Sequence, residues 1–137
     1  MSSLYRRSGL GPAQKDATQF ISSIEADRML FESVIEINKA HVVMLGRKRI
    51  VPRKHVRRIL RALRQIRGLP KSAEAEDVHV AVEEAVTRRA GSSAGGYLQL
   101  AKSRNDQVAT AIRMGLRNET LEIMDLLIRL LAELQRT

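Results

Sequence analysis

The chain of 137 residues has no cysteine, no tryptophan and only four aromatic residues, which are Tyr5, Phe20, Phe31 and Tyr97. Without cysteine it has neither a disulfide framework nor a thiolate metal site. So few aromatic rings offer little on which the bases of single-stranded nucleic acid could stack. No apolar run approaches the roughly 20 residues that cross a bilayer, and the first residues lack the pattern of a secretory signal. We therefore expect a soluble, intracellular protein with an aliphatic core.

The net charge of +9 originates in one segment of the chain. Between Gly46 and Gly68 the sequence has no acidic residue, and its ten basic residues there are Arg47, Lys48, Arg49, Arg53, Lys54, Arg57, Arg58, Arg61, Arg64 and Arg67. The rest of the chain is therefore close to neutral, so the basicity is a local feature. Such a segment is typical either of a solvated helix face or of a surface that attracts nucleic acid. We favour the solvated face.

Apolar residues recur with a helical period in four stretches, and nothing alternates with a period of two. The stretches run over 22–45, 53–67, 75–90 and 103–137. We therefore predict an all-α fold with an irregular arm over 1–19, a helical domain over 20–102 and the start of a long bundle helix over 103–137. Gly68 and Pro70 predict a glycine cap at the end of the second stretch, and the glycine- and serine-rich residues 91–96 predict a connector.

The last stretch is too apolar for a helix with one buried face. Its large aliphatic side chains are Leu121, Ile123, Met124, Leu126, Leu127, Ile128, Leu130, Leu131 and Leu134. A helix that is apolar on most sides has to be buried by other helices. One side could pack on the helices of the same chain, but 137 residues supply too few helices to cover the other. We expect this helix either to self-associate or to belong to a longer protein.

Two polar clusters lie near the starts of the first and third stretches. Ser23 and Asp27 are four residues apart and share one helix face. Asp77 and His79 begin the third stretch, where Glu76 and Asp77 would complement the helix dipole. Taken alone, the first pair is an ordinary N-terminal turn and His79 a structural histidine.

A third cluster, residues 103–107, opens the last stretch after the connector. Ser103 and Asp106 have the spacing of a capping box, which accounts for them without any function. Capping does not account for Arg104 and Asn105. A guanidinium fork, a side-chain amide and the backbone N–H groups of a helix start together suit a carboxylate. The residues by themselves therefore predict an anion site. No Ser-His-Asp order, nucleotide loop or metal-ligand spacing is present, so we predict no metal and no cofactor.

Three blocks of sequence agree in order and separation with one enzyme family. Residues 103–110 read S-R-N-D-Q-V-A-T after G-G-Y-L at 95–98, residues 22–27 read S-S-I-E-A-D, and residues 76–79 read E-D-V-H. These blocks resemble the argininosuccinate lyase family of the fumarase/aspartase superfamily. The resemblance covers residues 20–117, with the run of eight residues as its most specific part.

The resemblance implies a cytoplasmic homotetramer of arginine biosynthesis, whose central helices form a bundle. It implies β-elimination of argininosuccinate to arginine and fumarate, without a metal or organic cofactor, at sites built from several subunits. It places Arg104 and Asn105 on substrate carboxylates, Ser23 and Asp27 on other polar groups of the substrate, and His79 nearby for orientation. The implied substrate-binding residues are Ser23, Asp27, Asp77, His79, Ser103, Arg104 and Asn105. No specific nucleic acid and no membrane is implied as a partner.

The chain departs from the family pattern in three ways. The family commonly has L-H-T-x-R before S-R-N-D, whereas Gln99, Leu100 and Lys102 replace the His, the Thr and the Arg here. Residues 5–9 read Y-R-R-S-G instead of W-G-G-R-F. The family's T-H-x-Q segment with the catalytic histidine and its G-S-S-x-M-P-x-K-x-N loop with the serine base do not occur. We therefore interpret the chain as an N-terminal portion that contains no catalytic acid or base.

Two other functions stay open at this point. The basic segment alone would fit a helical nucleic-acid-binding module, which leaves residues 103–110 without an explanation. The same fold could also serve a related lyase with another substrate, adenylosuccinate or aspartate, because Gln99 and Leu100 alter the loop before S-R-N-D.

Overall fold

The computed structural model describes residue 20, residues 22–70 and residues 75–136, so the arm predicted over 1–19 lies outside the described residues. These residues form helices joined by turns and contain no strand, which confirms the all-α prediction. A short 3-10 helix precedes five α-helices, and their bounds are η1 Ala26–Leu30, α3 Phe31–Arg47, α4 Arg53–Gln65, α5 Val78–Ala90, α6 Ser92–Gly95 and α7 Arg104–Leu134.

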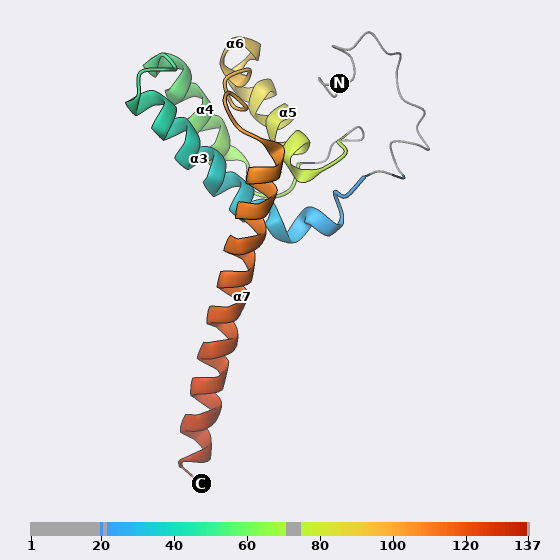
Figure 1. The fold of residues 1–137 in the computed structure, drawn as a ribbon, viewed down its shortest axis with the longest axis vertical. Coiled ribbons are helices and arrows are strands. Elements are labelled where there is room, and N and C mark those ends of the chain that lie inside the picture. The colour runs from blue at the N-terminus through green and yellow to red at the C-terminus, as the bar shows by residue number, and fades with distance from the viewer. Residues whose placement is uncertain (1–19, 21, 71–74, 137) are drawn as a thin grey trace.

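The core lies between α3, α4 and α5, with α6 and the start of α7 closing it. Val34 of α3, Ile59 of α4 and Val82 of α5 are completely buried there. The apolar stripe of each helix faces this core and the arginines of α4 face outward, as the helical period predicts. Figure 1 shows helices α3 to α6 clustered at one end of α7, whose first turns contact α3, while the rest of α7 extends away from the cluster.

Several helix boundaries differ from those predicted. The first predicted helix divides into a turn, η1 and α3, and the third begins at Val78 because Asp77 serves as its N-cap. The second ends at Gln65, and Ile66 after it is extended with φ −84° and ψ 108°. The predicted glycine cap at Gly68 is therefore wrong, since α4 has already ended before this residue.

The connector over 91–96 is also different from the prediction, because it contains the short helix α6. Gly91 has φ 80°, in the region that favours glycine, and allows the sharp change of direction after α5. Gly95 lets α6 lie directly on α5, since a Cβ there would be 2.7 Å from the Cα of Thr87. Gly91 thus permits the turn after α5, and Gly95 permits the close packing of α6 on α5.

Among the described residues, helix α7 contacts the other elements only through its first third. Every described residue from Leu116 onward is exposed, and the large aliphatic side chains from Leu121 to Leu134 are 52% to 63% exposed. The expectation that one side of this segment packs on the chain's own helices is therefore wrong, whereas the expected uncovered apolar surface is present. None of the described helices is long and apolar enough to cross a membrane.

Candidate functional site

Asp77 is the centre of the candidate site, because its carboxylate both caps α5 and joins this helix to the start of α7. One carboxylate oxygen accepts a hydrogen bond from the backbone N–H of Val80 at 2.7 Å and so caps α5. The other oxygen forms an ion pair with the guanidinium of Arg104, at the start of α7. Asp77 therefore fixes the position of Arg104 across 27 residues of sequence.

The segment with Ser23 lies beside the same end of α5. The backbone N–H of Ser23 and the hydroxyl of Ser22 donate to the carbonyl of Glu76 at 2.8 and 3.1 Å. The Ser23 hydroxyl donates to the Asp27 carboxylate at 2.7 Å. Sequence spacing placed these two side chains on one face, and the structure pairs them directly. The first two polar clusters thus meet at one place.

His79 is buried, with 2% of its surface exposed, and both ring nitrogens are without a hydrogen-bond partner among the described residues. Burial lowers the pKa of His79 below its ordinary value of 6.5, while the Asp77 carboxylate opposes this shift. The Arg104 guanidinium lowers the pKa further and the Asp27 carboxylate raises it, so all three charges lie close to the ring. A buried imidazole without partners is costly, and such groups in native proteins point to a ligand or a water.

Asn105 and Ser103 are exposed, and neither side chain has a hydrogen bond to the described residues. Ser103 is the N-cap residue of α7, but its hydroxyl does not cap the helix, so the capping-box interpretation is wrong for Ser103. The amide of Asn105 and the hydroxyl of Ser103 are therefore free to contact another molecule at the α7 start.

Sequence reasoning missed a second polar group, which holds the loop before α7. The ammonium of Lys102 donates to the side-chain oxygen of Asn38 at 2.5 Å, and Asn38 donates to the Val34 carbonyl at 2.8 Å. Asn38 is 1% exposed in the middle of the apolar stripe of α3, and the position of an Asn within this stripe was the signal available in the sequence. Burial raises the pKa of Glu83 above its ordinary 4.5, against the opposing charge of Arg104.

The loop has two further attachments. The ring Nε2 of His41 on α3 donates to the carbonyl of Leu100 at 2.8 Å, and the Gln107 amide donates to the Gln99 side chain at 3.0 Å. Ala101, between these contacts, has φ 57°, which is unfavourable for a residue with a side chain. The surrounding contacts therefore hold the loop in a strained conformation just before Arg104.

No protein-family model matches the chain. Curated proteins named argininosuccinate lyase are similar to most of it. The lyase of Methanothrix thermoacetophila is 40% identical over 135 residues, which are 97% of this chain and 28% of that lyase. The lyase of Methanosphaera stadtmanae is 42% identical over 80% of this chain and 24% of its own length. The lyase of Pyrococcus furiosus is 38% identical over 93% of this chain and 28% of its own length.

Over most of its length the chain is therefore similar to one part of proteins named argininosuccinate lyase. It spans 24% to 28% of the length of these lyases. The matched region includes both the basic segment and the three motif blocks, so the basic segment is not a separate module attached to a lyase sequence.

Two of the residues that depart from the argininosuccinate lyase pattern form hydrogen bonds within the chain. Gln99 accepts the hydrogen bond from Gln107, and Lys102 binds Asn38. Both residues therefore fix the loop internally. Leu100 is 38% exposed and contributes its backbone carbonyl to the contact with His41.

The stability of the chain is expected to depend on Lys102 in alkaline solution. Burial lowers the pKa of Lys102 from its ordinary 10.5 to about 8, with the Glu83 carboxylate opposing this effect. Between these two values the unfolded chain keeps a proton that the folded chain has lost. The Lys102 contribution to the free energy of unfolding therefore rises with pH over this range.

Denaturant titrations at several pH values would measure this, with Lys102→Met compared with Lys54→Met, an exposed lysine of α4. The free energy of unfolding of the wild type, relative to that of Lys102→Met, should rise from pH 8 to 10.5. Lys54→Met should show the same pH dependence as the wild type. A difference that is constant with pH would contradict the inferred burial of this ammonium.

Proposed function

We propose that the chain is the N-terminal portion of a lyase that splits argininosuccinate into arginine and fumarate. The observation that carries this is identity of 40% over 97% of the chain to a protein named argininosuccinate lyase. The placement of the motif residues around Asp77 supports it, because the three sequence blocks lie together at one site. We further propose a cytoplasmic homotetramer that acts in arginine biosynthesis.

The reaction is a β-elimination, in which a base removes a proton beside a carboxylate and an acid protonates the leaving guanidinium nitrogen. The intermediate carries extra negative charge on that carboxylate, so fixed positive groups and N–H donors lower the barrier. Arg104 and Asn105 would supply these groups. Asp77 uses part of the Arg104 guanidinium and holds its orientation, and the remaining N–H groups of the five are available to the substrate.

The other motif residues would bind the rest of the substrate. The Ser23 and Asp27 pair is a hydrogen-bonding surface beside the α5 start, suited to the polar groups of the arginine part. His79 would orient the neighbouring charges, and the exposed Ser103 hydroxyl would contact a carboxylate. The base and the acid would come from the part of the lyase that this chain does not span. A related lyase acting on adenylosuccinate or aspartate is less well supported, because the relatives reported above are all named argininosuccinate lyase.

A chimera tests this proposal. The chain would replace the matched segment of the Methanothrix thermoacetophila lyase, and fumarate release from argininosuccinate would be followed by ultraviolet absorbance. We expect the chimera to be active and the isolated chain of 137 residues to be inactive. Fumarate release by the isolated chain would contradict the assignment of acid and base, and a folded, tetrameric but inactive chimera would contradict the lyase function.

A further inference from the structure

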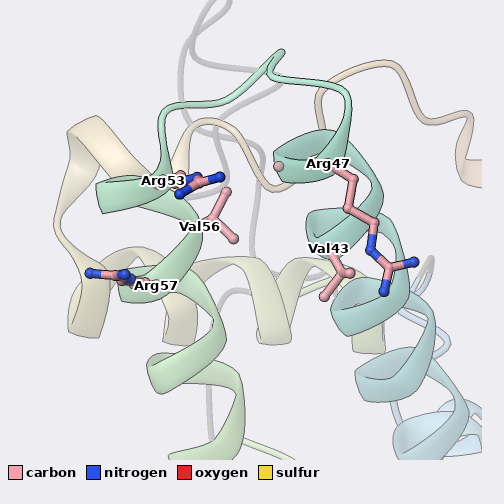
Figure 2. A pocket seen from close by; sticks show the side chains of 6 residues that line it. Val43, Arg47, Arg53, Val56 and Arg57 are labelled. Carbon is pink, nitrogen blue, oxygen red and sulfur yellow. The ribbon is translucent and has the colours of Figure 1, made fainter.

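A cleft separates the C-terminal end of α3 from the N-terminal end of α4. It has a volume of about 250 Å³, and its lining residues are Val43, Gly46, Arg47, Arg53, Val56 and Arg57. Figure 2 shows Val43 and Val56 between the two helices, with Arg47 carried by α3 and Arg53 and Arg57 by α4. The cleft lies at the end of α3 remote from η1, and its lining includes none of the candidate substrate-binding residues.

The three arginines of the cleft have no ion-pair partner in the part of the chain that the structure describes. All three are exposed, and the sequence from Gly46 to Gly68 has no acidic residue that could neutralise them. A guanidinium stays protonated throughout the physiological range. The cleft therefore has at least three permanent positive charges around an apolar floor.

The fold does not account for the charges on α4. Its first turn contains Arg53 and Lys54 and no acidic residue, and the N-cap Pro52 provides no side-chain hydrogen bond. Positive charges in the first turn of a helix oppose its dipole and destabilise it. Arg47 differs, because a cation in the last turn of α3 complements that dipole. Arg53 and Lys54 at the start of α4 thus oppose the helix dipole, and this points to an anionic ligand that compensates for them.

We propose that the cleft binds a compact oligophosphate, a ligand with two or three adjacent phosphate groups. Guanidinium groups form paired hydrogen bonds with phosphate oxygens, so arginines on two walls can engage neighbouring phosphates together. The valine floor keeps water from one side of the ligand, which strengthens these charge interactions. The backbone of a nucleic acid also presents adjacent phosphate groups that such arginines could bind. We favour the free oligophosphate, because a short cleft between two helix ends has room for a compact ligand and not for an extended strand.

Calorimetric titration of the chain with inorganic tripolyphosphate tests the proposal. The variant Arg53→Gln/Arg57→Gln removes two charges from the cleft, and Arg61→Gln/Arg64→Gln removes two charges from the same helix outside it. We expect the affinity to fall about tenfold or more in the first variant, as for the loss of charged hydrogen bonds, and less than about threefold in the second. Equal losses in the two variants would overturn the proposal, because binding would then follow net charge alone.

Two further measurements distinguish the ligand and the role of the arginines. A short oligothymidylate that binds at the cleft more tightly than tripolyphosphate would assign the cleft to a nucleic-acid backbone and overturn the choice of a free oligophosphate. Without ligand, Arg53→Gln/Arg57→Gln should leave the melting temperature unchanged or raise it, because it relieves the charge at the α4 start. A lower melting temperature would show a structural role for these arginines and overturn the proposal as well. None of these results depends on lyase activity.

Discussion

Replacing Asn105 with alanine in the chimeric lyase is expected to lower kcat/KM by about a hundredfold to a thousandfold, as for the loss of a hydrogen-bond donor to the developing negative charge. Asn105 is exposed at the first turn of α7, next to the ion-paired Arg104. Its side chain has no hydrogen bond to the described residues, so its removal should cost little stability. The loss should appear in kcat more than in KM, because the donor acts mainly on the transition state.

The matched control is Asn118→Ala, which makes the same change on the exposed surface of α7 away from the site. We expect it to keep the activity of the parent chimera. Steady-state assays of both variants, together with their melting temperatures, would separate catalysis from folding. Full activity of Asn105→Ala would remove the assignment of this amide to the substrate. Equal losses in both variants would attribute the effect to α7 as a whole.

We expect the chain to self-associate through α7, and we expect replacement of Leu127 and Leu131 with lysine to convert it to monomers. Burial of one large aliphatic side chain contributes about 1.5–3 kcal/mol. Leu127 and Leu131 are 53% and 59% exposed, and the described residues from Leu116 onward have no buried side chain. An apolar surface of this extent marks an interface. Because this part of α7 contributes nothing to the core of its own chain, the double variant should dissociate without unfolding the domain.

Sedimentation velocity over a range of concentrations measures this effect. The control Asn118→Lys/Gln135→Lys adds the same charge to exposed polar positions of the helix and should still self-associate. Circular dichroism should show unchanged helix content in the domain of the Leu variant. A wild-type chain that sediments as a monomer at high concentration would contradict the expectation that α7 is an interface.

The sequence predicted the helices well wherever an apolar stripe was long enough to have a period. The stripes of α3, α4 and α5 became the core, since burying them is the main favourable term in folding. The four residues of α6 are too few to show a period. The end of α4 was predicted wrongly because the glycine signal at Gly68 follows a helix that Ile66 has already ended.

The site was predictable in its parts and not in its connections. Asp77 was expected to complement the helix dipole, and it does cap α5. Its ion pair with Arg104 depends on tertiary packing, which no local pattern encodes. Local patterns alone supported only an anion site at residues 103–107, and the substrate came from the resemblance of three separated motifs. The contact between Lys102 and Asn38 also joins distant segments, although an Asn at a position of the apolar stripe was a visible signal in the sequence.

A crystal structure of the chimera with bound argininosuccinate would show directly which residues bind the substrate. We predict substrate carboxylates against the Asn105 amide and the free N–H groups of Arg104, with other polar groups of the substrate beside Ser23 and Asp27. The Asp77 carboxylate should still hold Arg104 and cap α5. Argininosuccinate bound at a site that excludes the start of α7, with Asn105 exposed to solvent in the complex, would contradict the assignment of Arg104 and Asn105 to the substrate carboxylates.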